Sequence, residues 1–359
     1  MMLTKKAFAY GGIALLVLLV IAGVTLGFVF GYKTPEASPY RQKMVIDHDG
    51  GADDAYAIAM AFQYELYFNG PNVIALTASY GNVNLTQAII NSGRILKLVK
   101  RNDIPIYAGA SRCLITGIAS DHYFGYDGLG DFLGPGDPVA VPNEHAAVAL
   151  IEMSKKYKGE LVVVALGPLT NIALAIRLDP LFLSRLAHLY VGGGHVWGKD
   201  YPDPEFNAEM DVEAYYIVAD VAKLGKVTFV PFSQVYKSLS ISKDWRINVF
   251  GSIKNPLVQT LTSYERISLP SSEDWTLLDP VVTAIALDNS IVTEFKETAN
   301  SIITCGEHRG VNTNYFIHAK PNSRIVYTAD LQKYKDFLIA VFSAGMTPTK
   351  EQRRKFNQY

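Results

Sequence analysis

The feature that most constrains the fold is an alternation of short, β-branched apolar runs with longer stretches of helical periodicity. The runs expected to be strands cover residues 44–46, 73–78, 104–107, 161–166, 188–191, 227–230, 301–304 and 324–327. The stretches expected to be helices cover residues 53–64, 86–100, 145–157, 170–177, 212–224 and 330–343. Strands joined through helices lie parallel, so the alternation predicts an α/β fold with a mostly parallel central sheet flanked by helices, Rossmann-like in layout. Such a sheet binds its ligand beyond the carboxyl ends of the strands.

Charge and composition exclude several classes of protein. The 359 residues include 33 Lys+Arg and 34 Asp+Glu, and 49% of them are hydrophobic. This balance excludes a disordered chain and argues against a nucleic-acid partner, because neutralising phosphates requires an excess of basic side chains. Cys113 and Cys305 are the two cysteines, too few for a disulfide framework. One bridge and two free thiols both remain open.

An uncharged apolar segment lies near the amino terminus. Residues 7–32 contain no charged side chain and would reach about 39 Å as a helix, enough to span a bilayer. We expect a short cytosolic tail (1–6), one N-terminal transmembrane helix acting as a signal anchor (7–32), a stalk (33–41) and a main domain (42–359). The main domain is then extracellular or luminal. A cleaved signal peptide, which would give a secreted protein, is the alternative.

The most informative segment is acidic and follows the first expected strand. It reads Asp-His-Asp-Gly-Gly-Ala-Asp-Asp at residues 47–54, with four carboxylates in eight residues. Carboxylates this close repel one another unless a cation lies among them, and oxygen ligands of this kind suit Ca²⁺ or Mg²⁺. A solvated loop with Asp53 or Asp54 as a helix N-cap accounts for only one or two of the acids.

Several further blocks appear in a fixed order after this segment. They are Tyr-Gly-Asn-Val at 80–83, Gly-Tyr-Asp-Gly-Leu-Gly at 125–130, Leu-Gly-Pro-Leu-Thr-Asn at 166–171, Val-Gly-Gly at 191–193, Glu-Phe-Asn at 205–207 and Leu-Asp-Pro at 278–280. With them, residues 43–342 resemble the inosine-uridine preferring nucleoside hydrolase family, whose signature is Asp-Thr-Asp-Pro-Gly-x-Asp-Asp after the first strand. The resemblance implies a nucleoside-hydrolase-like catalytic domain that splits ribonucleosides into ribose and free base for purine or pyrimidine salvage.

The resemblance also implies roles for individual residues. The Ca²⁺ ligands would be Asp49, Asp54, the main-chain carbonyl of Leu166 and Asp279, with the ribose hydroxyls completing the set. Asp49 would also be the general base that activates a metal-bound water. The ribose would be held by Asp53, Asn82, Glu205 and Asn207. These residue types suit the reaction, because N-glycoside hydrolysis passes through an oxocarbenium-like state attacked by an activated water.

The base end of the site departs from the family pattern. Leu278 stands where family members carry His or Trp, and Phe124 stands where they carry a second His, so neither position supplies a proton to the leaving base. Residues that we consider for the base pocket are Phe124, Tyr126, Trp197, Trp275 and Leu278. Residues considered as substitute proton donors are His122, Tyr126, His195, Trp197, Tyr264 and Trp275.

Two further positions carry alternative interpretations. Lys199 replaces a frequent Asn near the 5′-hydroxyl and would favour an anionic 5′ end, or else it is a solvent-facing lysine. Asn84-Leu85-Thr86 is a glycosylation sequon, although Asn84 is equally suited to cap a helix.

Two other functions stay open on the sequence alone. A nucleoside-binding ectodomain with weak or lost catalysis fits Leu278 and Phe124. A haloacid-dehalogenase-like phosphatase fits Asp47-x-Asp49 after a strand, but it leaves Asp53, Asp54 and the later blocks unexplained. The resemblance further implies assembly as a homodimer or homotetramer.

Overall fold

A nine-stranded sheet organises the protein, which we describe from a computed structural model covering residues 42–131, 134, 136, 138–317 and 320–346. Its strands are β1 (Lys43–His48), β2 (Asn72–Ala78), β3 (Ile106–Ala108), β4 (Leu161–Ala165), β5 (His188–Gly192), β6 (Val227–Val230), β9 (Val292–Ile302), β10 (Asn312–Tyr315) and β11 (Ser323–Ala329). A separate two-stranded ribbon pairs β7 (Ile241–Ser242) with β8 (Asp274–Trp275). All described residues belong to one compact unit.

The strand order is β10-β9-β11-β6-β5-β4-β1-β2-β3. Strands β1 to β6 and β11 pair in parallel, whereas β9 and β10 pair antiparallel at one edge. The chain therefore adds β2 and β3 on one side of β1 and later adds β4, β5 and β6 on the other. This is the doubly wound order 3-2-1-4-5-6, and its reversal point lies between the carboxyl ends of β1 and β4. The predicted mostly parallel sheet is confirmed.

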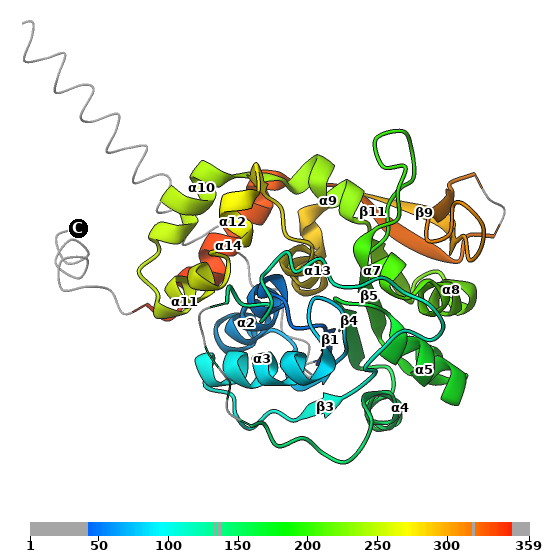
Figure 1. The fold of residues 1–359 in the computed structure, drawn as a ribbon, viewed down its shortest axis with the longest axis horizontal. Helices are drawn as coiled ribbons and strands as arrows, with labels where there is room; N and C mark the ends of the chain where they lie inside the picture. Colours follow the sequence, from blue (N-terminus) through cyan, green and yellow to red (C-terminus); the bar gives the residue numbers. More distant parts are fainter. Residues whose placement is uncertain (1–41, 132–133, 135, 137, 318–319, 347–359) are drawn as a thin grey trace, which may run out of the picture. The chain divides into compact units, whose positions relative to one another are not determined.

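Helices cover both faces of the sheet (Figure 1). On one face α4 (Ala146–Lys156), α5 (Thr170–Leu178), α6 (Phe182–Arg185) and α8 (Val212–Val221) bury their apolar sides against β1, β4 and β5. The opposite face carries α2 (Ala52–Tyr67), α3 (Leu85–Leu98), α13 (Leu278–Leu287) and α14 (Leu331–Ser343). The remaining α-helices are α7 (Phe206–Met210), α9 (Phe232–Leu239), α10 (Lys243–Asn248), α11 (Pro256–Tyr264) and α12 (Ser268–Ser271), and two short 3-10 helices are η1 (Phe250–Ser252) and η2 (Asn289–Ile291).

Helix α2 is the central helix of the second face. Its residues from Ala52 to Phe62 are all buried, because α13, α14 and α11 cover the side that the sheet does not. Alanine-rich composition suits such a crowded position and favours the helix. The helix begins where the Asp54 carboxylate accepts a hydrogen bond from the Gly51 N–H (2.7 Å), and Asp53 also lies in the first turn.

The sequence located most elements of the sheet, with clear exceptions. Residues 301–304 were expected to be a strand, but β9 begins at Val292 and ends at Ile302. Three of the eleven β9 residues are charged and eight are at least partly exposed, so the strand lacks the apolar run by which the other strands were predicted. The helices between residues 232 and 287 and the short edge strand β10 were missed. These elements are at most ten residues long, shorter than the window of about 11–18 residues over which apolar periodicity is read.

Several expectations concern residues near the termini or side chains outside the core. The expected transmembrane helix at 7–32, like the tail and stalk that flank it, lies outside the described residues. Within the described part of the chain, none of the helices combines the length and apolar character that a bilayer crossing requires.

Cys113 and Cys305 are both free thiols. Asn84 caps α3 by accepting a hydrogen bond from the Gln87 N–H at 3.0 Å.

A buried ion pair ties α2 to the helices of the chain's last third. Arg246 and Glu265 are both buried, and Arg246 Nε donates to Glu265 Oε2 at 3.1 Å. The Tyr56 hydroxyl donates to the same carboxylate oxygen at 2.8 Å, and the Trp275 indole N–H donates to its other oxygen. The Arg246 guanidinium also lies over the Phe250 ring, 5.2 Å from its centroid.

We predict that Glu265→Gln lowers the free energy of unfolding by about 3–5 kcal/mol, because it leaves Arg246 charged and buried without its partner. Asp103→Asn removes an exposed partner of Arg101 and is the matched control, expected to change stability by about 1 kcal/mol or less. Urea unfolding of the purified protein measures both. Equal, small effects of the two substitutions would show that the buried pair does not hold these helices together.

Candidate active site

The acidic segment begins with Asp47, whose hydrogen bonds connect neighbouring elements at the end of the sheet. Asp47 lies at the end of β1, fully buried, and its Oδ1 accepts hydrogen bonds from Thr77 Oγ1 (2.5 Å) and Asn171 Nδ2 (2.8 Å). Asn171 also accepts from the Ala110 N–H at 2.8 Å. Burial raises the pKa of Asp47 to about 7. This carboxyl thereby joins the carboxyl ends of β1 and β2 to the start of α5.

Asp49 is held rigidly by the loop that follows β2. Its two oxygens accept from the main-chain N–H of Asn82 (2.7 Å) and from Asn82 Nδ2 (2.9 Å). Gly81 makes room for this contact, because a Cβ at that position would lie 1.9 Å from Asp49 Oδ2. Gly167, after β4, approaches from the other side, where a Cβ would lie 2.9 Å from the Cβ of Asp49. Close backbone packing of this kind requires glycine.

Three carboxylates converge next to Asp49. Asp53 and Asp54 on α2 and Asp279 on α13 each place one carboxylate oxygen within 4.8 Å of the others. Asp54 and Asp279 come from opposite ends of the chain, and the packing of α13 against α2 brings them together. Burial, followed by the charges of Asp49 and Asp53, raises the pKa of Asp54, and burial likewise raises the pKa of Asp279.

This cluster fits a divalent cation. Asp54 Oδ1 and Asp279 Oδ2 are buried and have no hydrogen-bond partner among the described residues. A buried, unpartnered carboxylate oxygen is strongly disfavoured unless a cation or a proton satisfies it. All the donor atoms are oxygens, which Ca²⁺ and Mg²⁺ prefer over softer ligands. The buried Asp cluster is thus able to bind a metal ion.

The residues predicted to bind ribose include one member of this cluster, Asp53, and two residues that follow β5, Glu205 and Asn207. Glu205 caps α7 and accepts hydrogen bonds from the N–H groups of Gly194 (2.7 Å) and Ala208 (3.1 Å). Asn207 Nδ2 donates to the Leu166 carbonyl at 2.7 Å. Glu205, Asn207 and Asp53 retain 6–8% of their accessible surface, whereas Asp49 and Asp54 retain none. The metal candidates therefore lie deeper than the ribose candidates.

The positions predicted to face the base are apolar. Phe124 is 5% exposed, and its ring lies 3.0 Å from where a Cβ of Gly51 would stand. The same Cβ would meet Asp53 Oδ1 at 2.8 Å and Asn82 Nδ2 at 2.9 Å, so Phe124 borders the ribose candidates. Leu278 is 6% exposed and packs beside Gly192 at the end of β5.

The structure separates the other aromatic candidates into buried and exposed groups. Trp275 is buried in the Arg246–Glu265 cluster, which favours a packing role over contact with a base. Tyr126 is 77% exposed, and its ring packs at a tilt against that of His122 with ring centroids 4.3 Å apart. Trp197 is 58% exposed.

The remaining candidates lie in loops or helix ends. Lys199 is exposed in the turn closed by Gly198 and Tyr201. The His195 ring contacts those of Tyr201 and Phe232, and burial lowers its pKa to about 4. Tyr264 is buried at the end of α11.

Comparison with known proteins places the chain in a family. Residues 44–336 match the family model for inosine-uridine preferring nucleoside hydrolases. The chain belongs to this family. Its members are N-glycosyl hydrolases that act on ribonucleosides, so the expected family and enzyme class are confirmed.

Individual members agree with this assignment. The chain is 34% identical over 290 residues to a probable uridine nucleosidase 2 of Arabidopsis thaliana, covering 77% of this chain and 86% of that protein. It is 26% identical over 261 residues to the inosine-uridine preferring nucleoside hydrolase of Leishmania major, covering 70% of this chain and 81% of that protein. A solved plant nucleoside hydrolase, PpNRh1, superimposes with a TM-score of 0.76 at 25% identity, covering 85% of this chain and all of that one. The fold is that of the family.

Sequence reasoning missed several residues that support the site. Asp47 was counted in the acidic segment but received no role in the nucleoside-hydrolase interpretation, and Thr77 and Asn171 were not linked to it. Asn91, in the middle of α3, was not singled out at all. An asparagine inside a helix is a weak signal, because its function becomes visible only when its distant partners are known.

We predict that divalent cations stabilise the chelator-treated protein against heat. At a free concentration about 100 times the Kd, binding adds about 2.7 kcal/mol and raises Tm by about 4 °C. The double variant Asp54→Asn/Asp279→Asn should lose this shift, whereas Asp103→Asn should keep it. Thermal unfolding monitored by circular dichroism measures the shift. The cluster would not be a cation site if the double variant responded as the wild type does.

Proposed function

We propose that this protein hydrolyses the N-glycosidic bond of ribonucleosides to ribose and free base in a Ca²⁺-dependent reaction, with Asp49 as the general base. The observation that carries the proposal is the convergence of Asp54 and Asp279, each with an unpartnered buried oxygen, beside the rigidly held Asp49. Residues that lie more than two hundred positions apart in the chain converge at the reversal point of the sheet, where doubly wound folds bind ligands.

The proposed metal ligands are Asp49, Asp54, Asp279 and the main-chain carbonyl of Leu166. Asp53 also belongs to the buried cluster, although the resemblance assigns it to the ribose. A divalent cation bound there supplies the Lewis acidity that acidifies water and the charge that fixes the ribose diol. Oxygen-only donors support Ca²⁺ in preference to Zn²⁺ or copper.

Asp49 is suited to accept the proton of the attacking water. Asn82 holds both carboxylate oxygens, which fixes the direction of the acceptor and removes the need for reorganisation during the reaction. The chemical step breaks the bond between the anomeric carbon and the base nitrogen, and the water oxygen forms the new bond to that carbon. Asp49 takes up one proton of the water, and the electron pair of the broken bond leaves with the base.

The ribose is proposed to contact Asp53, Asn82, Glu205 and Asn207. Asp53, Glu205 and Asn207 retain 6–8% of their accessible surface whereas Asp49 and Asp54 retain none, which supports an order from metal to sugar to base. Carboxylate and amide oxygens around the sugar stabilise the positive charge that develops on it in the transition state. Phe124 and Leu278 then offer the base an apolar surface without a proton donor.

A binding protein with weak or lost catalysis is the second candidate function. The apolar Phe124 and Leu278 favour it, because general acid catalysis contributes about 10²–10⁴-fold and neither side chain provides it. The retained Asp49, held through both of its oxygens by Asn82, favours the hydrolase. The phosphatase alternative loses its support, since the family assignment explains the later blocks that it left unexplained.

We predict that the purified protein releases ribose from ribonucleosides and that chelation stops the release. Without the 2′-hydroxyl, 2′-deoxyribonucleosides should show a kcat/KM about 10⁴-fold lower, because buried polar groups lose their partner. Asp49→Asn should lower kcat by about 10²–10⁴-fold, while the control Asp103→Asn stays at the wild-type level. A reducing-sugar assay measures all of these rates. Nucleoside binding that gives no ribose and is unchanged in Asp49→Asn would instead identify a binding protein.

We also propose that residues 7–32 anchor the protein in a membrane, with the catalytic domain extracellular or luminal. The uncharged length of the segment supports this topology, and secretion after signal cleavage is the alternative.

Lys199 remains a proposed contact for an anionic 5′ end, and a homodimer or homotetramer remains the proposed assembly.

The topology has a direct test in cells that express the full chain. We expect the protein to stay with membranes after alkaline carbonate washing, because a single apolar helix resists extraction. Protease added to intact cells or vesicles on the non-cytosolic side should degrade the catalytic domain. Recovery of a soluble form whose sequence begins near residue 33 would instead establish the secreted alternative.

A further inference from the structure

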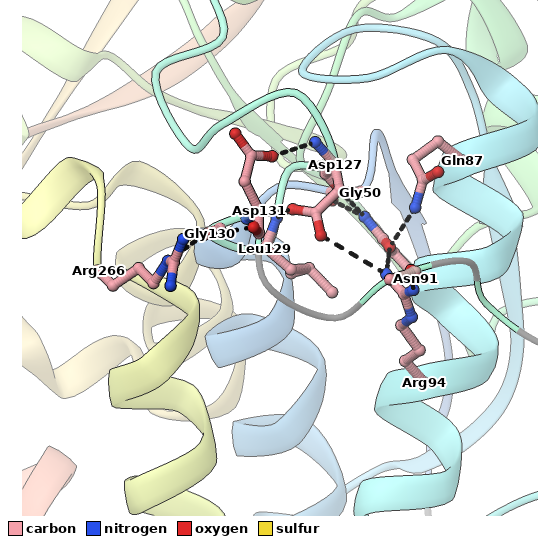
Figure 2. Close-up of polar contacts among 10 residues, drawn as sticks. Gly50, Gln87, Asn91, Arg94, Asp127, Leu129, Gly130, Asp131 and Arg266 are labelled. Carbon is pink, nitrogen blue, oxygen red and sulfur yellow. Dashed lines mark hydrogen bonds and ion pairs between the residues drawn. The ribbon is translucent and has the colours of Figure 1, made fainter.

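One buried asparagine joins the two loops that form opposite parts of the proposed site (Figure 2). Asn91 lies on α3 with no exposed surface. Its Nδ2 donates to the Gly50 carbonyl at 2.8 Å and to the Asp127 carbonyl at 2.7 Å. Its Oδ1 accepts from Gln87 Nε2 (2.9 Å) and from Arg94 (3.2 Å). Both donor hydrogens and the oxygen are used, which fixes the orientation of the amide.

The first carbonyl belongs to the acidic segment. Gly50 lies between Asp49 and the start of α2, so its position sets how the segment turns from β1 toward Asp53 and Asp54. Gly50 has a φ of +85°, and a Cβ there would lie 2.8 Å from the backbone of Ala88 on α3. The turn at Gly50 thus packs directly against α3, the helix that carries Asn91.

The second carbonyl belongs to a closed turn that carries Phe124. Asp127 Oδ1 accepts from the N–H groups of Leu129 (2.7 Å) and Asp131 (2.9 Å), and Asp131 Oδ1 accepts from the Asp127 N–H (2.7 Å). The Gly130 N–H donates to the Phe124 carbonyl at 3.0 Å. These bonds close residues 124–131 into one hydrogen-bonded turn, so holding the Asp127 carbonyl also restrains the backbone of Phe124.

Other contacts hold this turn from different sides. Arg266 donates to the carbonyls of Gly130 and Asp131, and Arg94 lies 3.9 Å from the Asp127 carboxylate. Asn91 differs from these two arginines because its single amide group donates hydrogen bonds both to the turn and to the acidic segment. Gly128 also packs against the Gly50 carbonyl, where an added Cβ would lie 2.7 Å from the oxygen, but packing limits only how close the two loops come. Losing the Asn91 amide removes the hydrogen bonds that hold the loops at this separation, while the turn stays attached to the domain.

We propose that Asn91 is a positioning residue that sets base selectivity, by holding the Phe124 turn at a fixed distance from the acidic segment. The proposal rests on the proposed function and deepens it. Phe124 borders Asp53 and Asn82, so a shift of the turn changes the space left for the base while the sugar contacts remain in place. A displacement of about 1 Å at a reacting site changes rates by up to about 100-fold.

The test compares Asn91→Asp with a matched control, Asn322→Asp. Asn322 Nδ2 also donates to two carbonyls, those of Ala219 and Asn300, both at 2.9 Å, and its Oδ1 accepts from Asn300 N–H and Ser323 Oγ. In each variant a carboxylate faces two carbonyls that it repels. Only the Asn91 variant alters the loops of the site.

The readout is the ratio of kcat/KM for uridine to kcat/KM for inosine, two substrates that differ only in the base. We expect Asn91→Asp to change this ratio by about 10-fold or more and Asn322→Asp to leave it within about 2-fold. An unchanged ratio in Asn91→Asp, with ribose still released, would overturn the positioning role and leave the proposed function intact. Asn91→Ser, which retains one donor, replaces Asn91→Asp if that variant does not fold, and it should shift the ratio in the same direction.

Hydrogen exchange supplies a second readout that needs no activity. We expect faster amide exchange in residues 49–51 and 124–131 of the Asn91 variant, with no such change in the Asn322 variant. If the wild type released no ribose from either nucleoside, the proposed function would fail, and exchange would still decide whether Asn91 couples the loops. Unchanged exchange at both segments would overturn the coupling itself.

Discussion

Six carboxyl groups are buried around the reversal point of the sheet, and their mutual repulsion is the constraint on which the rest of the structure depends. They belong to Asp47, Asp49, Asp53, Asp54, Glu205 and Asp279. Among the residues that the structure describes, no Lys or Arg forms an ion pair with any of them. Burying so much like charge is strongly unfavourable unless protons or a cation offset it. The fold thus gathers acidic groups at the place where the proposed metal-dependent reaction would need them.

Neutral hydrogen-bond donors, rather than basic side chains, hold this charge in place. Asn171 binds Asp47, Asn82 binds Asp49, and the main-chain N–H groups of Gly194 and Ala208 bind Glu205. An amide orients a carboxylate without neutralising it, so the carboxylate remains available to a cation or a proton. Asn91 extends the same principle to main-chain carbonyls, by linking two loops instead of two side chains.

The sequence predicted those parts of the site that depend on local pattern. Asp47 to Asp54 follow a strand and precede a helix, so their clustering at the sheet edge was readable from the chain alone. The meeting of Asp54 with Asp279 was an implication of the family resemblance, because only tertiary packing of α13 on α2 creates it. The sequence did not predict roles for Asn91 and Asn171 in the site, because the hydrogen-bond partners that connect them to it, Asp127 and Asp47, lie 36 and 124 positions away. Trp275 was considered for the base pocket because aromatic side chains stack on bases. The structure instead buries Trp275 beside Glu265, and no local sequence pattern predicts that contact.

The most direct measurement of the central claim is a crystal structure of the Asp49→Asn protein grown with Ca²⁺ and a ribonucleoside. We predict anomalous density for one ion in contact with Asp54 and Asp279, with the 2′- and 3′-hydroxyls of the ribose facing the same ion. An ion bound elsewhere, or a nucleoside whose sugar points away from these two carboxylates, would contradict the claim that the buried acids form one metal and ribose site.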